Sequence, residues 1–465
     1  MDCDQLRALP IDALIEVILS LQARVAAFAA LQARVAQLEA ELARAHQPAK
    51  TPANSSVPPS QGHKANRAER RGRKPGARRG HLGRSRLRQP PDQVVKVRPS
   101  ACGNCGTELC SRDQRRVGKS QVIELPPVQP MVIELWRYAA VCPACQHRTV
   151  AKAPAGLEPH RVCGSRVEAL LGSLHERHHL SYQRLVEVCQ ELFGLPLSEG
   201  AIANALARLA ERARPAYAAI AAEVRGSPVQ GSDETRARVS GQYRCHWVFQ
   251  TEQASYHQLA TTKGAAVIDE FLAGAAPEVW ISDLAPAQLG VPAAAHQICL
   301  AHQLRDLQYA IEVDDPLGVR WAVALQRVFR RGIHLHHERG QMTPESFLRR
   351  RILIEHAAER LICCDWAGDG EAGNLQRRYA KHRDDLFVFL EREGVEPTNN
   401  ASERDLRNSV IHRKVTGGYR SNWGAHASMI LISILTTARK QGQGYFAALH
   451  AVAGPSPLQA AGMGS

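Results

Sequence analysis

The pattern of apolar and polar positions divides the chain into a helical start and a later stretch of alternating strands and helices. Between residues 11 and 45, apolar residues recur every seven positions, at Leu14, Leu21, Phe28, Val35 and Leu42. The second core position of each heptad holds Val17, Leu31 and Leu38, and Arg24 interrupts the series. This repeat favours a self-associating coiled coil. The alternative is an amphipathic helix packed on the chain's own body.

The regular pattern stops at residues 46–92, where proline and serine disfavour helices and strands. Within this linker, residues 64–88 hold eleven Lys or Arg and one acid, which gives +10 of the formal net charge of +14. Flexible basic segments lie along DNA phosphates and enter minor grooves. A solvated run of charge is the alternative. The residues that we expect to contact DNA are Arg70, Arg71, Arg73, Lys74, Arg78 and Arg79.

Residues 93–153 contain two Cys-x-x-Cys pairs, which are Cys102, Cys105, Cys142 and Cys145. Paired turns of this kind present four thiolates to a tetrahedral Zn²⁺. Strand-like runs at 121–125 and 131–138 would fold back and bring the pairs together. We therefore predict a zinc ribbon with a closed, structural site. Buried or redox-active cysteines are the alternative.

Residues 164–224 have apolar residues at helical spacing. A break at 193–200 precedes a second helix, expected at 201–214 with Ser198 as its N-cap. This arrangement is helix-turn-helix-like and would place a helix in a DNA major groove. A plain helical connector explains the pattern equally well.

Strands and helices alternate from residue 228 onward. We expect strands at 229–239, 244–251, 255–261, 278–283 and 295–300, with a helix at 264–273. Three adjacent strands followed by helix and strand indicate a mixed α/β sheet. Residues 303–395 are mostly helical in pattern and form a large insertion.

Three acids in this region are candidates for one site. Asp233 and Asp283 close strand-like runs, and Glu403 lies near the start of a helix for which Asn399 and Asn400 are suitable N-caps. Carboxylates of this kind can converge on two Mg²⁺ ions, with Mn²⁺ as a substitute, roughly 3.5–4 Å apart. We expect Asp283 to bridge them. Taken singly, each acid is better explained as a cap or a salt bridge.

Neighbouring side chains complete this prediction. Cys299 and His302 form a Cys-x-x-His pair without a second half, which favours a packing or hydrogen-bonding role near the site. Arg407 shares a helical face with Glu403 and would form an ion pair with it. Arg413, Lys414 and Arg420 add positive charge close to Glu403, where phosphates could be held.

Length and composition limit the remaining choices. A chain of 465 residues is too long for one ordinary core, so several domains are expected. No uninterrupted apolar run approaches the ~20 residues that a membrane span needs, and no signal peptide opens the chain, so we expect a cytoplasmic protein without a membrane partner. Twelve cysteines in such a chain favour metal binding or free thiols over disulfides.

Several short motifs together resemble transposases of the insertion sequence sixty-six family, large-subunit type. They are Asp-Glu-Thr at 233–235, CLAHQLRDL at 299–307, NNASERDLR at 399–407 and GGYRSNWGA at 417–425, preceded by the zipper and the paired cysteines. The resemblance implies a ribonuclease H-like DDE catalytic domain with a helical insertion before the glutamate. It also implies Mg²⁺-dependent cleavage at element ends, strand transfer into target DNA, small accessory proteins and a nucleoid-associated location.

The predicted organisation is a multidomain α+β protein. Its parts are a coiled coil (11–45), a basic linker (46–92), a zinc ribbon (93–153), a helical DNA-binding region (164–224), a ribonuclease H-like catalytic domain (228–441) with an insertion at about 303–395, and a tail (442–465). A catalytically inactive, repurposed zinc-containing DNA-binding protein is the main alternative. A structural, zinc-dependent oligomeriser is a third class.

Overall fold

The structure is a computed structural model that describes residues 10–45, 48–55, 81, 83, 86–364 and 368–461. It divides into two compact units. The first comprises residues 1–63, 165–179 and 206–454, and the second comprises 64–164, 180–205 and 455–465. Asp233, Asp283 and Glu403 all belong to the first unit.

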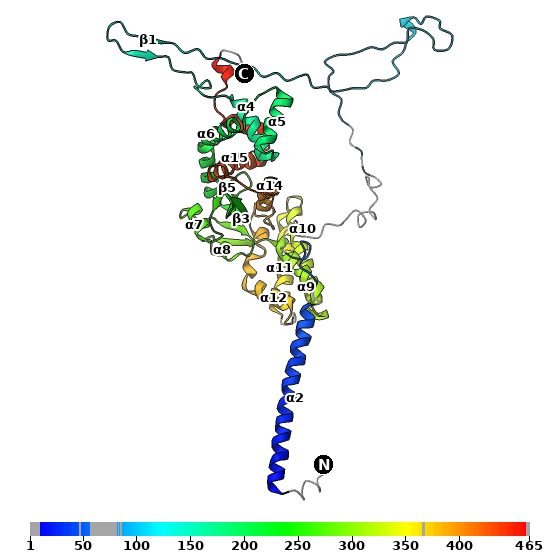
Figure 1. Cartoon of the computed structure of the whole chain (residues 1–465). Coiled ribbons are helices and arrows are strands. Elements are labelled where there is room, and N and C mark those ends of the chain that lie inside the picture. The colour runs from blue at the N-terminus through cyan, green and yellow to red at the C-terminus, as the bar shows by residue number, and fades with distance from the viewer. Residues whose placement is uncertain are drawn as a thin grey trace. The chain divides into compact units, whose positions relative to one another are not determined.

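Residues Ile11–Ala45 form one long helix, α2, as the heptad repeat predicts (Figure 1). Much of its apolar stripe is exposed to solvent, including Leu21, Phe28, Leu31, Val35 and Leu38. An exposed stripe is what a coiled-coil helix presents to a partner helix. Self-association through α2 stays a prediction.

The same helix corrects one expectation about membranes. Over Ile11–Val35 it is long and apolar enough to cross a bilayer, and it is the one such helix in the described residues. Asp12, Glu16, Arg24 and Arg34 break the apolar run into short pieces, so no uninterrupted apolar run of that length is visible in the sequence. Helices of soluble proteins meet the same criterion of length and composition.

In the second unit, regular structure is sparse between residues 93 and 153. Strands β1 (Ala139–Val141) and β2 (Arg148–Val150) form a short antiparallel hairpin, and Ser111–Asp113 form one 3₁₀ turn, η1. The strands predicted at 121–125 and 131–138 do not form. Their apolar side chains, among them Val122, Leu125, Val132 and Trp136, are exposed, so they have no common face to bury and nothing to stabilise strand pairing.

Helices follow as the pattern predicts. They are α4 (Ser165–Gly172), the π-helical turn η2 (Ser173–Arg177), α5 (Tyr182–Phe193) and α6 (Glu199–Gly226). The hydroxyl of Ser198 accepts a hydrogen bond from the N–H of Ala201 at 3.2 Å, as expected of an N-cap. Helix α6 continues beyond the predicted end at Arg214, because Pro215 is accommodated inside it.

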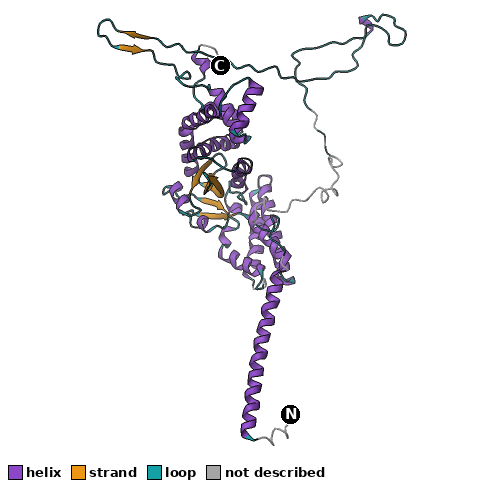
Figure 2. Ribbon diagram, viewed as in Figure 1, coloured by secondary structure: helices purple, strands orange, loops and turns teal. Residues whose placement is uncertain are grey.

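A five-stranded sheet forms the centre of the first unit (Figure 2). Its strands are β3 (Val229–Val239), β4 (Gln242–Gln250), β5 (Ser255–Ala260), β6 (Val279–Ser282) and β7 (Ala295–Ile298). They lie in the order β5-β4-β3-β6-β7, with β3, β4 and β5 antiparallel and β6 and β7 parallel to β3. The predicted mixed sheet is confirmed, with strand ends within two residues of those expected.

Helices pack against the sheet. The Phe271 ring of α7 (Ala266–Leu272) stacks on Phe249 of β4, with ring centroids 3.9 Å apart. The short helix α8 (Pro286–Leu289) follows β6. Helix α15 (Asn422–Lys440) lies along the edge strand β5, where its Ser433 hydroxyl accepts a hydrogen bond from the backbone N–H of His257 at 2.9 Å. This contact covers a strand edge that would otherwise be open to pairing.

The segment between β7 and α14 is helical, as predicted. It contains α9 (Leu300–Val313), α10 (Pro316–Glu338), η3 (Arg339–Gln341), α11 (Pro344–Cys363), α12 (Glu371–Lys381), η4 (Arg383–Asp385) and α13 (Val388–Glu391). Large side chains such as Trp321, Phe329, Tyr379 and Phe389 are fully buried within it. The insertion therefore has an apolar core of its own, which continues to Val279 and Ile281 of β6.

The chain then returns to the sheet through α14 (Asn400–Thr416) and α15. The expected tail at 442–465 contains two helices, α16 (Tyr445–Val452) and α17 (Pro457–Ala460). Leu449 of α16 is fully buried and lies against Gly172 at the end of α4. The sequence analysis assigned no helix to this tail, because its Gly- and Ala-rich composition hid an apolar helical face.

Candidate active site

The pairing of β3 with β6 places two of the predicted acids side by side. These strands are parallel, with Gly231 opposite Ile281. Asp233 lies two residues further along β3, and Asp283 directly follows the end of β6, so the two acids lie at the same end of the paired strands. Neighbouring strands lie about 4.8 Å apart.

The third acid is brought to this place by the start of α14. The Asn399 side-chain amide donates a hydrogen bond to the backbone carbonyl of Ser232 at 2.7 Å, and its own N–H donates to the Cys299 sulfur at 3.1 Å. The N–H of Leu300 donates to the carbonyl of Pro397 at 2.9 Å. These bonds join α14, α9 and β3 next to Asp233. Asn399, which makes two of them, precedes Glu403 by four residues.

The three acids share one electrostatic neighbourhood. Burial raises the pKa of Asp233 well above its usual range, and the negative charges of Glu234, Asp283 and Glu403 raise it further. The Asp233 Oδ1 accepts a hydrogen bond from the N–H of Glu234 at 2.8 Å, and the Asp283 Oδ1 accepts one from Ala285 at 3.0 Å. Each carboxylate is thus oriented by one backbone amide.

This arrangement falls short of a closed metal cage. In the part of the chain that the structure describes, no three His, Cys, Asp or Glu side chains are grouped closely enough to hold an ion. The assignment of Asp233, Asp283 and Glu403 as ligands therefore stays a prediction. Glu234 has a different role, because it lies on the opposite face of β3 and pairs with Lys263 at 2.7 Å.

Two nitrogen-bearing side chains of α9 face Glu403. The His302 Nε2 and the Arg305 Nη2 each lie 3.7 Å from the Glu403 Oε1. Burial lowers the pKa of His302, and the Arg305 charge lowers it further. The predicted partner Arg407 is exposed to solvent, whereas Arg305 was missed by the sequence analysis. The spacing of three residues from His302 was the available signal.

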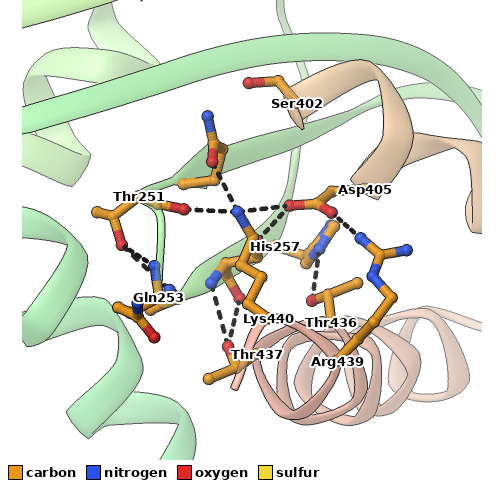
Figure 3. A network of polar contacts seen from close by, with 12 residues as sticks. Thr251, Gln253, His257, Ser402, Asp405, Thr436, Thr437, Arg439 and Lys440 are labelled. Carbon is orange, nitrogen blue, oxygen red and sulfur yellow. Dashed lines mark hydrogen bonds and ion pairs between the residues drawn. The ribbon is translucent and has the colours of Figure 1, made fainter. Parts of the chain in front are cut away.

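A buried polar network fixes α14 on its other side (Figure 3). Asp405, which is 1% exposed, accepts a hydrogen bond from the Ser255 hydroxyl and pairs with Arg439 and with the Lys440 ammonium, the last at 3.4 Å. Lys440 also donates to the Gln250 side chain at 2.7 Å. These contacts join α14 to α15, β4 and β5. Nothing in the sequence marked Asp405 out from the surrounding surface acids.

The turn after α14 is attached to the β3–β4 hairpin. Gly418 has a φ of +111°, and the next residue, Tyr419, donates its N–H to the Arg238 carbonyl at 2.8 Å. The N–H of Ser240 donates to the Tyr419 carbonyl at 2.9 Å. The segment with Arg413, Lys414 and Arg420 is therefore held at the far end of β3 from Asp233.

The two Cys-x-x-Cys segments adopt the same turn. In the first, the N–H of Cys102 donates to the Thr107 carbonyl and the N–H of Gly106 donates to the Cys102 carbonyl, at 2.8 and 2.9 Å. Cys142 makes the equivalent bonds with His147 and Gln146, both at 2.9 Å. A hydrogen bond from the Thr107 hydroxyl lowers the pKa of Cys105 to about 7. The described residues do not bring the four sulfurs together.

The predicted DNA-contacting residues Arg70, Arg71, Arg73, Lys74, Arg78 and Arg79 lie outside the described residues.

Comparison with known proteins identifies the family. The model of the family described as "Transposase IS66 family" matches residues 160–427, which is more than half of the chain. An uncharacterized protein y4jO of Sinorhizobium fredii (strain NBRC 101917 / NGR234) is 33% identical over 79 residues. The aligned part is 17% of this chain and spans 25% of that protein. The family match covers α4 to the start of α15, which includes all three acids and the helices that position them, and the chain therefore belongs to the IS66 family of transposases.

Proposed function

We propose that the chain is a DNA transposase that cleaves phosphodiester bonds at the ends of its element and joins the freed 3′-hydroxyl to target DNA. The observation that carries this proposal is the meeting of three elements. The β3–β6 register sets Asp233 beside Asp283, and Asn399 ties the helix of Glu403 to Ser232. The strand order β5-β4-β3-β6-β7, with three antiparallel strands followed by two parallel ones, favours the ribonuclease H-like core that the family resemblance implies.

The donor set suits divalent cations. Asp233, Asp283 and Glu403 offer carboxylate oxygens, which Mg²⁺ and Mn²⁺ prefer, and a cation would relieve the repulsion between these neighbouring charges. When bound, the ions supply activation of the attacking hydroxyl and neutralisation of the leaving oxygen. The chain's own residues orient the carboxylates, through the amides that bind Asp233 and Asp283 and through Asn399.

The test is Mg²⁺-dependent nicking of a labelled duplex that carries the terminal repeat of the element. Asp233→Asn, Asp283→Asn and Glu403→Gln should each abolish nicking while DNA binding stays measurable. Glu234→Gln is the matched control, because Glu234 is an adjacent acid on the opposite face of β3 and should keep most of the activity. Normal nicking by the three site variants would rule out this site.

A catalytically inactive, repurposed DNA-binding protein predicts a different result with the same duplex. It would bind the element end and show no Mg²⁺-dependent nicking in any variant. A structural oligomeriser would show no DNA affinity. A steep fall of affinity with salt would speak against that third class, because it reports release of counterions from DNA phosphates.

Further parts of the chain have proposed roles in DNA handling. The basic linker would lie along phosphates, α5 and α6 would act as a helix-turn-helix-like reader, and α2 would join two copies of the chain. The α2 proposal is tested by sedimentation of the full chain and of a variant with Leu21→Asp and Phe28→Asp. A wild-type chain that sediments as a monomer would contradict it. Small accessory proteins and a nucleoid-associated location rest on the family resemblance.

Zinc binding is proposed for Cys102, Cys105, Cys142 and Cys145. Its support is the identical backbone turn of the two pairs, because each turn presents two thiols as half of a tetrahedral site. Metal analysis of the purified chain should give one zinc per chain, reduced by Cys102→Ser or Cys142→Ser and unchanged by Cys110→Ser. Absence of zinc from the reduced wild-type protein would refute the assignment.

A further inference from the structure

We infer that Arg305 is a DNA-contacting residue of the active site, which binds a phosphate at or beside the position of cleavage. This inference rests on the proposed function and adds a residue that holds the substrate. It starts from the position of the guanidinium, whose Nη2 lies 3.7 Å from the Glu403 Oε1.

Helix α9 aims Arg305 at the site through fixed contacts. The helix begins where Cys299 accepts the hydrogen bond from Asn399 and where Leu300 donates to Pro397. Arg305 follows His302 by three residues and shares its helical face. Both side chains consequently approach the same oxygen of Glu403, and α9 and α14 cannot shift independently at this point.

The hydrogen-bonding capacity of Arg305 is largely unused. A separation of 3.7 Å is too long for a hydrogen bond, so Glu403 attracts the guanidinium by charge without occupying its N–H groups. The Nε of Arg305 is buried and has no hydrogen-bond partner among the described residues. The side chain as a whole is 24% exposed, so its outer edge is accessible to a ligand. A planar fork with free donors is suited to two parallel hydrogen bonds with a phosphate.

The negative charge of the site explains why a guanidinium is useful at this position. The negative charges of Asp283 and Glu403 act on Asp233, and Lys263 is already paired with Glu234 at 2.7 Å on the other face of β3. A DNA phosphate that approaches these acids is repelled. Arg305 is the permanently charged side chain that contacts Glu403, so it can offset this repulsion where the strand must lie.

A purely structural ion pair between Arg305 and Glu403 is the competing explanation, and the two can be separated by pairing protein variants with DNA variants. Binding of the full chain to the element-end duplex is measured in EDTA, where cleavage does not occur. A second set of duplexes carries a neutral methylphosphonate at the cleavage position or at either neighbouring phosphate. The variants are Arg305→Ala and Arg305→Lys, with Arg327→Ala, an exposed arginine of α10, as the control.

A phosphate contact predicts that Arg305→Ala weakens binding of the natural duplex by about tenfold or more. One methylphosphonate should weaken wild-type binding by a similar factor and cause no further loss in Arg305→Ala. Arg305→Lys, which keeps the charge and loses the fork, should fall between. Equal loss by Arg305→Ala on every duplex, or no loss at all, overturns the inference while the proposed function stands. A wild-type chain that neither binds nor nicks the element end overturns both.

Discussion

Replacing Asp405 by alanine tests how the helix of Glu403 is held in place. Asp405 is 1% exposed and is the counterion of Lys440, which is 10% exposed, and of Arg439, which is 34% exposed. Removing one partner of a buried ion pair costs about 3–5 kcal/mol, because the remaining charge stays buried without compensation. Lys440 keeps its bond to Gln250, and Arg439 can turn toward water, so we expect the lower end, about 3 kcal/mol.

Thermal unfolding followed by circular dichroism measures this effect on the full chain. For a domain of 150–250 residues, 1 kcal/mol shifts Tm by about 2–4 °C, so Asp405→Ala should lower Tm by about 6–12 °C. Glu211→Ala is the matched control, since it breaks an exposed pair with Arg214 and should change Tm by less than about 2 °C. The double variant Asp405→Ala, Lys440→Met should recover part of the loss, because it removes the buried charge that the single variant leaves.

The reasoning is refuted if Asp405→Ala melts within about 2 °C of the wild type, or if the double variant is no more stable than the single one. In the first case the network does not hold α14 as tightly as its burial indicates. In the second, the loss comes from the cavity and not from an uncompensated Lys440.

Three further predictions concern residues that attach α14 and α15 to the sheet. Gly418→Ala should destabilise by about 1–3 kcal/mol, because its φ is +111° and a Cβ would lie 2.6 Å from the Arg238 carbonyl oxygen. Asn399→Ala should cost about 1–3 kcal/mol in thermal unfolding, because it removes the bond to the buried Ser232 carbonyl. Lowering the pH from 6.5 to 5 should destabilise the fold by about 2 kcal/mol through His257. Burial, together with the Lys440 charge, lowers the pKa of His257 to about 3. Stability falls with falling pH because His257 takes up a proton below pH of about 6.5 in the unfolded chain, where its pKa is about 6.5, and does not in the folded chain.

Each of these predictions has a control variant and an outcome that would contradict it. Gly226→Ala, with no atom near its added methyl group, should be neutral, and equal melting of the two glycine variants would contradict the steric argument. Asn400→Ala should also be neutral, because Asn400 is exposed. His257→Gln should reduce, without abolishing, the dependence of Tm on pH between 5 and 6.5, because burial also lowers the pKa of His246 and of His412. Parallel curves for this variant and the wild type would show that His257 is not responsible.

The apolar pattern was enough to predict much of the region from residue 228 onward. Strand β3 has the predicted bounds, the other four strands differ by one or two residues, and the insertion is mostly helical, as expected. The reason is that these segments are buried, so their apolar periodicity reflects the packing that the fold imposes. The pattern failed at 121–138, where apolar residues at strand spacing remain exposed, and at 442–461, where small residues concealed α16.

Residue type and spacing are enough to recognise the groups that can do chemistry, which are the three acids, the paired cysteines and the basic linker. Which of these groups come together depends on the tertiary structure. Residues 233, 283 and 403 are separated by long segments of chain, and their proximity depends on the β3–β6 register and on the bond from Asn399 to Ser232. Arg305 and Asp405 acquire their importance in the same way. Their partners come from other helices and strands, so the local sequence pattern does not predict these contacts. A charged residue on a helix has the same local pattern whether it faces water or a buried counterion.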